Sequence, residues 1–522
     1  MMKRTIIAIV LGLAVSGLVK AVAQNAATMP QLTAQERRGR AIYLRGEGTG
    51  PGGMVAFIGE LEVPASTLAC AGCHGAHGEG KTEGGVTAGS LVWSQLLKSD
   101  GHTHPTGRKH GPFTEASFIR AVAEGLDPAG NKLLVAMPRY RMSAEEMAEL
   151  IAYLKRIETD YAPGINDTSI EVGVVLPSKG PLVEMGESMR AVIAAYFEDL
   201  NTRGGVYNRR ITLRVVEPTG TALLAQNRNV FAYVGGISAG ADAELAKLAR
   251  EQEIPFVGLS TLMPDEEKPL NRHLFYLISG VKEQARALVN FAASKAESKK
   301  ARTAVVSGEG VIAVAAATAA EEQLKKAGVE TVIRKTYKEL GGDGAMAARQ
   351  LKQSGIESVF LFGVGGGNAA LVTEANALGW TPRLFMVSVL DGTELLGSTP
   401  ATFKDRVFIS FPTVPADVTT AGLAEFRPLL EKYKVTPRHI AAQLMAFAAA
   451  KVFTEGLKRA GQDLTRERLI TALEGLYDFE TGVTPPLTFG PNRRIGATGA
   501  YIITIDPVKK EYVPASGWVA AF

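Results

Sequence analysis

The two cysteines of this chain are separated by two residues and followed directly by a histidine, in Cys70-Ala-Gly-Cys73-His74. Two intervening residues bring both thiols to one side of a short helical turn. Each thiol can there form a thioether with a haem vinyl group, and the adjacent imidazole then lies under the iron. Because Cys-x-x-Cys-His is the attachment sequence of c-type haem, we predict one covalent haem c with His74 as an axial ligand of its iron.

Three other interpretations of the cysteine pair compete with haem attachment. A disulfide is the ordinary use of two cysteines in an oxidising compartment. A thioredoxin-like redox pair would stand in a βαβ pattern, and a closed zinc site needs four ligands. The glycine-rich, polar residues 74–80 that follow fit neither of these last two sites. Haem attachment is therefore the favoured hypothesis.

A second axial ligand of a six-coordinate haem is usually a thioether or an imidazole, and its identity sets the potential. Met137 stands in an Ala-Met-Pro-Arg-Tyr loop fixed by proline, just before a helix that Ser143 caps. Met142 directly precedes this cap, while Met147 belongs to an apolar stripe at helical spacing, which is typical of packing. We predict Met137 as the sixth ligand, with Met142 as the alternative methionine.

Histidines offer a competing sixth ligand. His102, His104 and His110 lie among glycines, prolines and basic residues, a composition typical of a solvated surface loop. Ligation by two imidazoles would use chiefly His110. His77 lies on the same side of the haem as the first ligand, so we expect it at the surface or at the haem edge.

The elements that must position these ligands are helices. We expect an opening helix near residues 34–44, a middle helix around 114–124 and a closing helix that ends at Leu154. With the Cys-x-x-Cys-His segment and the Met-Pro loop, this order resembles class I cytochrome c, an all-α domain that we assign to residues 24–160.

In that family the closing helix crosses the opening helix beside the haem, and the methionine of Met-Pro is the sixth ligand. The resemblance thus implies His74 and Met137 as the axial pair. One departure from the family is the glycine-rich stretch of residues 46–66, which we interpret as an insertion.

The second part of the chain follows a short linker at residues 161–168, which is polar and contains proline and glycine. Beyond it, short apolar runs alternate with amphipathic helices, a pattern that predicts parallel sheets covered by helices. Its length suggests two lobes. Strands are expected at residues 171–176, 211–216, 231–234, 255–258, 303–306, 358–362, 384–387 and 407–411.

The order of several short segments in this part resembles the type I periplasmic binding proteins of the branched-chain amino acid and amide class. The matching segments are residues 172–181, 199–206, 234–239, 254–261 and 359–363. The resemblance covers residues 169–522 and implies an α/β fold of two lobes that close over a small solute.

In such folds, ligands bind outside the carboxyl ends of the strands. The likeness places Ser178, Ser238, Ser260 and Thr261 on loops of the first lobe, where hydroxyls and backbone amides can hold a carboxylate. Asp391 stands where the amino-acid binders carry an acid for the ammonium group. Each of these residues has an alternative interpretation as a turn or helix-cap residue.

One feature argues against an amino acid as the solute. Amino-acid binders tend to carry an aromatic residue just after the strand that matches 358–363, whereas this chain has the glycine-rich residues 363–368. A small organic acid, an alcohol-derived metabolite or an aromatic acid fits equally well. Without the proper spacing, these glycines do not indicate a nucleotide-binding loop.

Residues 1–23 have the three parts of a secretory signal: Lys3-Arg4, the apolar run 6–19, and small residues before an expected cleavage after Ala23. The alternative is an uncleaved anchor, but the run is shorter than the roughly 20 residues that span a bilayer. We expect no later stretch that is long and apolar enough to span a membrane, and we interpret residues 311–320 as a buried helix. We predict a periplasmic protein that is not embedded in the membrane.

Charge gives no indication of a nucleic-acid partner. Removing Lys3, Arg4 and Lys20 from the 57 basic residues leaves 54 against 53 acidic ones. Hydrophobic and charged contents of 46% and 21% are typical of soluble globular proteins.

These observations lead to a mono-haem electron carrier, not an enzyme, whose second domain senses or docks a small solute or a redox partner. One alternative is a receptor that delivers solute to an ABC permease, the haem being incidental. Another is an enzyme that oxidises its bound solute at the haem. By resemblance, a further alternative is an accessory electron acceptor of a periplasmic quinoprotein alcohol dehydrogenase.

Overall fold

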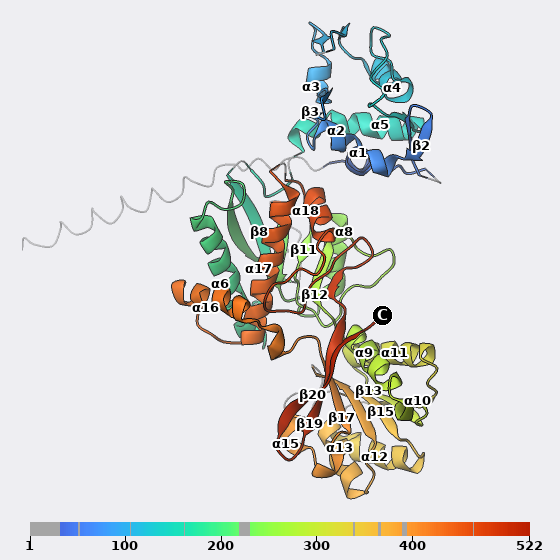
Figure 1. Cartoon of the computed structure of the whole chain (residues 1–522), viewed down its shortest axis with the longest axis vertical. Helices are drawn as coiled ribbons and strands as arrows, with labels where there is room; N and C mark the ends of the chain where they lie inside the picture. The colour runs from blue at the N-terminus through green and yellow to red at the C-terminus, as the bar shows by residue number, and fades with distance from the viewer. Residues whose placement is uncertain are drawn as a thin grey trace, which may run out of the picture. The chain divides into compact units, whose positions relative to one another are not determined.

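The structure, a computed structural model, describes residues 32–50, 53–104, 106–160, 162–166, 168–218, 230–337, 340–363, 367–388, 394–462 and 464–522. The chain divides into two compact units, Met1–Tyr161 and Ala162–Phe522 (Figure 1). The expected signal sequence at residues 1–23 and the expected ligand residue Asp391 lie outside the described residues.

The first unit is built around helices that begin where the sequence supplies caps. Thr33 and Ser143 each accept a hydrogen bond from the backbone of the first helical turn, and Glu36 and Glu146 return one, so both helices start with a capping box. The helices are α1 (Ala34–Arg45), α2 (Cys70–His74), α3 (Trp93–Leu96), α4 (Glu115–Glu124) and α5 (Ala144–Leu154).

The opening and closing helices α1 and α5 cross at very short range. A Cβ atom on Gly39 would lie 1.9 Å from the carbonyl oxygen of Glu149, so only glycine fits at the crossing. Beside it the buried rings of Tyr43 and Tyr153 pack with their centroids 5.7 Å apart. This crossing fixes the two helices that enclose the core of the first unit.

The expectation that the first unit is all-α requires correction. The glycine-rich insertion forms strands β1 (Val55–Ile58) and β2 (Leu61–Pro64), which make an antiparallel sheet with β7 (Arg139–Arg141). Hydrophobic residues in β1 favour a strand, and Ala56 pairs with Tyr140 on the buried side. Two small hairpins complete the unit, β3 (Lys81–Glu83) with β4 (Val86–Ala88) and β5 (His102–Thr103) with β6 (Lys109–His110).

The second unit contains two sheets, of which the first is entirely parallel with strand order β18-β12-β11-β10-β8-β9 (Figure 1). Helices α6 (Val183–Thr202) and α17 (Ile440–Ala460) cover one face, and α8 (Asp242–Glu251) covers the other. The strands are β8 (Ser169–Val175), β9 (Arg210–Val216), β10 (Ala232–Gly236), β11 (Phe256–Val257), β12 (Leu274–Ile278) and β18 (Ile495–Ala497).

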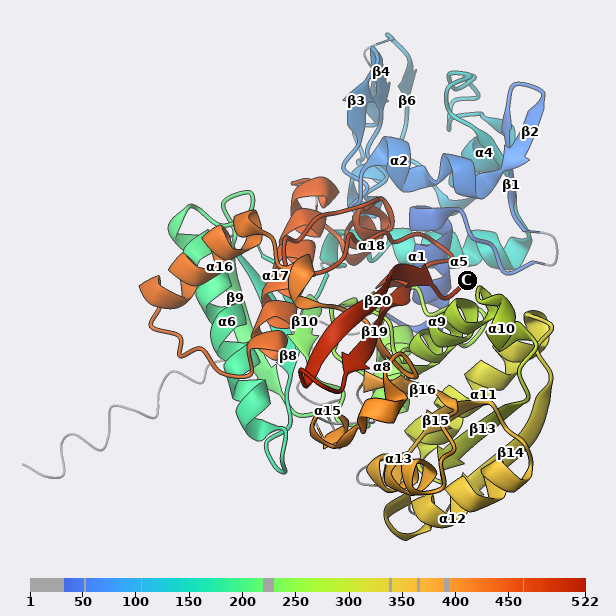
Figure 2. The same cartoon turned by 60° about the horizontal axis from the view of Figure 1, so that its bottom comes forward.

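The second sheet has the order β14-β13-β15-β16-β17-β19-β20 and ends in an antiparallel hairpin, β19–β20 (Figure 2). Helices α9 (Val281–Ala293) and α11 (Val311–Lys326) pack on one face, and α12 (Leu340–Gln353) and α13 (Gly367–Ala377) on the other. The strands are β13 (Thr303–Gly308), β14 (Thr331–Tyr337), β15 (Ser358–Phe362), β16 (Arg383–Val387), β17 (Val407–Phe411), β19 (Gly499–Asp506) and β20 (Glu511–Ala520).

All eight strands expected from the sequence are present, and each sheet forms one lobe. The chain passes between the lobes after β12, after β17 and after β18. The residues expected to be a linker pack on this unit: Ala162 is buried in its core, and the carbonyl of Gly164 accepts a 2.7 Å hydrogen bond from Glu171.

One helix among the described residues, α17, is long and apolar enough to cross a membrane by length and composition. This corrects the expectation that no stretch after the signal sequence meets that test. Of its apolar window, 61% is buried, and Phe447 and Phe453 belong to the core of the first lobe. The helix is apolar on most sides because it packs between α6 and the sheet.

Candidate haem-attachment and solute-binding sites

The short helix α2 carries both cysteines and the adjoining histidine. Cys70 is buried against the core of the first unit, Cys73 is exposed, and the two form no disulfide. The structure thus gives no support to the interpretation of this pair as a disulfide. Both thiols are available on one helical turn, as thioether attachment requires.

His74 is held in one orientation by a backbone carbonyl. Its Nδ1 lies 2.7 Å from the carbonyl oxygen of Gly89, which follows β4. Because a carbonyl can only accept, Nδ1 carries the proton and Nε2 is left with its lone pair. Burial lowers the pKa of His74, against the opposing effect of the Gly89 carbonyl. This is the arrangement by which proteins orient a metal-binding imidazole.

The candidate methionines lie at the edge of the same core. Met137 stands in a turn in which its N–H donates to the carbonyl of Leu134 at 2.9 Å, and it packs with Met142 on the cluster that contains Cys70. Met147 is buried on α5, as its helical spacing predicts. Two thiols on one helical turn, an imidazole held by a backbone carbonyl and a thioether at the edge of the core that contains Cys70 together fit a covalent haem.

The histidine segment is a hairpin rather than a solvated loop. His110 is 7% exposed and lies opposite His102 in the β5–β6 pair. Its Nδ1 donates to the carbonyl of Gly111 at 2.7 Å, and its Nε2 lies 2.9 Å from Nε2 of His104. Nε2 of His110 is therefore directed at another residue of the hairpin, which disfavours it as a ligand of the haem iron.

The hydroxyl residues of the first lobe follow neighbouring strands. Ser178 is exposed after β8, Ser238 is buried after β10, and Ser260 follows β11. The last two loops are joined, since the N–H of Ser238 donates to Ser260 at 3.1 Å and the N–H of Ser260 donates to Gly236 at 3.0 Å. The carboxyl edge of this sheet thus carries three of the predicted ligand residues.

Thr261 has an evident structural role. Its hydroxyl donates to Asp242 at 2.5 Å, at the start of α8, and accepts from the N–H of Met263 at 2.8 Å. These contacts match the turn and cap interpretation that the sequence left open.

Sequence reasoning gave no sign of the contact between His74 and the carbonyl of Gly89, because every residue type supplies a carbonyl.

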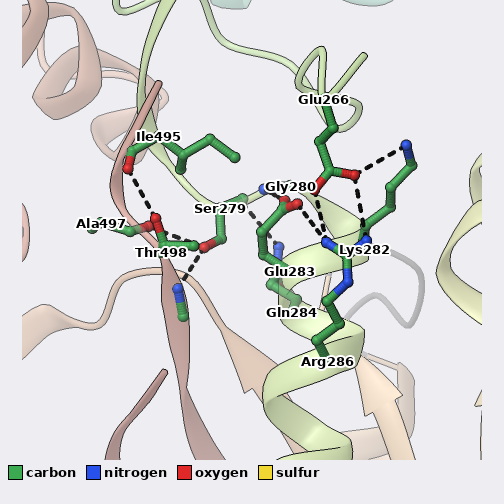
Figure 3. Close-up of polar contacts among 11 residues, drawn as sticks. Glu266, Ser279, Gly280, Lys282, Glu283, Gln284, Arg286, Ile495, Ala497 and Thr498 are labelled. Atoms are coloured by element: carbon green, nitrogen blue, oxygen red, sulfur yellow. Dashed lines mark hydrogen bonds and ion pairs between the residues drawn. The ribbon is translucent and has the colours of Figure 1, made fainter. Parts of the chain in front are cut away.

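Two of the crossings between the lobes are bonded to each other (Figure 3). The hydroxyl of Ser279 donates to the carbonyl of Ala497 at 3.0 Å and accepts from the N–H of Gly499 at 2.8 Å. The hydroxyl of Thr498 donates to the carbonyl of Ile495 at 2.9 Å. The two bonds of Ser279 therefore extend the β12–β18 ladder, whose last partners are Ile278 and Ala497, into the crossing segments.

Beside this crossing, two glutamates share one arginine (Figure 3). Arg286 lies 2.8 Å from Glu266 and 3.2 Å from the buried Glu283, while Lys282 lies 3.2 Å from Glu266. Burial, and then the hydrogen bond to Glu266, raise the pKa of Glu283. Burial also acts to raise the pKa of Glu266, but its hydrogen bonds and cationic neighbours outweigh burial and lower it.

The fold and these sites define a class of protein. It is a two-lobed α/β binding protein preceded by a small unit with a haem-attachment sequence. The chain belongs to the periplasmic binding protein family, whose profile matches residues 169–511, and it carries a cytochrome c domain matched over residues 65–158. A cytochrome c domain implies covalently bound haem c. The binding-protein family implies a periplasmic or extracellular location.

Relatives resemble the second unit. Leu/Ile/Val-binding protein homolog 3 of Brucella melitensis is 22% identical over 60% of this chain and 85% of its own length. Leu/Ile/Val-binding protein BraC3 of Rhizobium johnstonii is 19% identical over 62% of this chain and 88% of its own.

Solved structures agree on the fold of this unit. A putative branched-chain amino acid ABC transporter protein from Rhodospirillum rubrum superposes with a TM-score of 0.54 at 17% identity, over 66% of this chain and 99% of that one. A branched-chain amino acid ABC transporter protein from Thermus thermophilus with bound valine gives 0.51 at 19% identity, over 68% and 97%.

Proposed function

We propose that this protein is a periplasmic electron carrier with one haem c, whose second domain binds a small solute or docks a redox partner. The observation that carries the electron-transfer part is the 2.7 Å contact from Nδ1 of His74 to Gly89, on the helix that bears both cysteines. It supports His74 as an iron ligand, with Cys70 and Cys73 as the attachment points.

The haem supplies a one-electron centre when it is bound. Cys70 and Cys73 then hold it covalently, so it cannot dissociate. Gly89 keeps the imidazole of His74 in one tautomer, and the core around α1 and α5 excludes water. His74 and Met137 would together hold the iron, which favours electron transfer over reaction of a substrate at the metal.

The binding part of the proposal concerns the carboxyl edge of the first-lobe sheet. Ser178, Ser238 and Ser260 offer hydroxyls and backbone groups that suit a carboxylate, and Asp391 is the proposed partner of an ammonium group. Relatives named for leucine, isoleucine and valine support a small solute. Because residues 363–368 lack an aromatic residue, organic and aromatic acids belong in the same test.

A second candidate function is that of a substrate-binding receptor for an ABC permease. The names of the relatives favour it, since they are binding proteins of that kind. A periplasmic dehydrogenase is the competing partner if the second unit serves electron transfer.

One experiment separates these functions. The holoprotein is purified from its native periplasm under gentle conditions, and its small molecules and bound proteins are identified by mass spectrometry. A solute together with a permease component supports the receptor. A dehydrogenase that reduces the haem on addition of its substrate supports the electron carrier. A holoprotein that carries no solute and binds neither protein contradicts the function proposed for the second domain.

A further inference from the structure

Three of the chain's seven histidines lie together on one face of the β5–β6 hairpin. His102 and His110 are direct cross-strand partners, and His104 follows His102 by two residues, so the three side chains point to the same side. The ring centroids of His102 and His104 lie 5.0 and 5.1 Å from that of His110. None of these residues is needed for the proposed haem attachment.

The hydrogen bonds of this histidine cluster show which ring nitrogens present a lone pair that can bind a metal. Nδ1 of His110 must carry its proton, because it contacts the carbonyl of Gly111 at 2.7 Å, and its Nε2 therefore presents a lone pair. Nε2 of His104 lies 2.9 Å from this atom. Nε2 of His102 is buried and has no hydrogen-bond partner.

We propose that His104 and His110 chelate a divalent transition-metal ion, Cu²⁺ or Ni²⁺, through their Nε2 atoms. Metal–nitrogen bonds of about 2.0–2.1 Å, as known for imidazole, together with the 2.9 Å separation, give an angle of about 90° at the metal. That angle belongs to square-planar or octahedral coordination, the geometries that Cu²⁺ and Ni²⁺ adopt, rather than to the tetrahedral geometry of structural zinc.

His102 is the third donor after a change of rotamer. As the side chains stand, no three donor groups in the described part of the chain converge on one metal position. His102 occupies the same hairpin face as the other two, so rotation about its side-chain bonds moves its ring toward them. The unpartnered Nε2 of His102 loses no hydrogen bond in that movement.

The surroundings of the histidine cluster suit a cation. Arg108 belongs to the same hairpin, and its guanidinium is paired at 2.6 Å with the buried carboxylate of Asp127. His102 and His104 are half-buried, which leaves solvent a route to the site.

The competing explanation is a plain hydrogen bond, in which Nε2–H of His104 donates to Nε2 of His110. Metal-binding measurements on full-length ferric holoprotein distinguish metal chelation from this hydrogen bond. Ni²⁺ is titrated calorimetrically, and the electron paramagnetic resonance spectrum of added Cu²⁺ is recorded apart from that of the haem. We expect one ion per chain and nitrogen hyperfine structure from at least two imidazoles.

Variants assign the donors. His104→Gln and His110→Gln should each weaken Ni²⁺ binding at least tenfold and remove one nitrogen from the Cu²⁺ spectrum, and His102→Gln should weaken binding less. His439→Gln, which changes an exposed histidine of the second unit, is the matched control and should leave binding unchanged. Unchanged haem absorption verifies that each variant is folded.

Two results would overturn the proposal. One is Ni²⁺ binding to the unaltered protein that is undetectable, or that neither His104→Gln nor His110→Gln weakens. The other is a Cu²⁺ spectrum of the unaltered protein without imidazole nitrogens, a measurement that depends on no variant.

Discussion

Nδ1 of His74 contacts the carbonyl oxygen of Gly89 at 2.7 Å, and this contact joins the attachment helix to the loop after β4. It fixes both the tautomer and the plane of the imidazole. A ligand held in this way is ready for iron on its Nε2 side before any haem is bound. The functional hypotheses for the first unit rest on this relationship.

The sixth ligand is testable by a pair of substitutions. Met137→Ala should remove the weak sulfur-to-iron absorption band at the red end of the oxidised spectrum and lower the midpoint potential, because a thioether stabilises ferrous haem. Met142→Ala, at a position that packs on the same core, is the control and should leave the band in place. Loss of the band in Met142→Ala alone would show that the assignment is wrong.

The α1–α5 crossing predicts a large effect of one side chain. Gly39→Val places its Cβ 1.9 Å from the carbonyl oxygen of Glu149, so the helices must separate, at a cost of about 1–3 kcal/mol or more in the free energy of unfolding. Gly111→Ala is the control, because its Cβ would meet no atom within 4 Å and it stands outside the attachment helix. Denaturation followed by haem absorption measures both, and equal stabilities would contradict the close crossing.

The glutamate pair beside the lobe crossing predicts a pH dependence of stability. Burial and the neighbouring Glu266 raise the pKa of Glu283 from 4.5 to about 8, so between these values the folded chain holds a proton that the unfolded chain has released. The stabilisation is complete below about pH 4.5 and is lost as the pH rises through about 8. One proton gives a slope of up to about 1.4 kcal/mol per pH unit.

Glu266 acts in the opposite direction at lower pH, because its pKa is lowered to about 2. Measurements should therefore stay above pH 5. Glu283→Gln should flatten the decline of unfolding free energy, followed by circular dichroism, whereas Glu267→Gln, at an exposed neighbour, should not. The same slope in the Glu283→Gln and unaltered proteins would exclude Glu283 as its source.

The second unit should fold and bind a solute without the first. Ala162 and Gly164 contact this unit, so we expect a fragment of residues 162–522 to melt at a higher temperature than one of 169–522. A solute bound only by the folded state raises the melting temperature further. Thermal-shift screening of amino acids, amides, short organic acids and aromatic acids tests this.

Asp391→Ala distinguishes the classes of solute. It should abolish a shift caused by an amino acid and leave a shift caused by a simple acid intact. If no compound shifts the melting temperature and the fragment instead forms a stable complex with a periplasmic dehydrogenase, solute binding is the wrong function for this unit.

The sequence predicted the elements whose signals are local. The helices that Thr33 and Ser143 cap begin as expected, and the strands expected around α6, α8 and α9 are present. Strand β20 was missed because Pro514 and interspersed small residues hide its strand pattern, which an edge strand tolerates. The all-α expectation was wrong because glycines in residues 46–66 suggested a loop although they flank β1 and β2.

Contacts between distant segments could not be predicted. The carbonyl of Glu149 meets Gly39, and the carbonyl of Gly89 meets His74, only because the chain folds back on itself. Every residue has a backbone carbonyl, so no residue type in the sequence marks these contacts. The histidine hairpin is similar, since its composition is that of a surface loop while its strand register buries His110.

Covalent haem attachment tests the central claim most directly. Purified holoprotein is extracted with acid–acetone, and the pyridine haemochrome of the residual protein is measured against protein concentration. We predict colour that stays with the protein, the spectrum of a haem with two thioethers, and one haem per chain, all lost in the Cys70→Ala/Cys73→Ala double variant. Haem that is extracted into the solvent, or a protein without haem, would contradict the account.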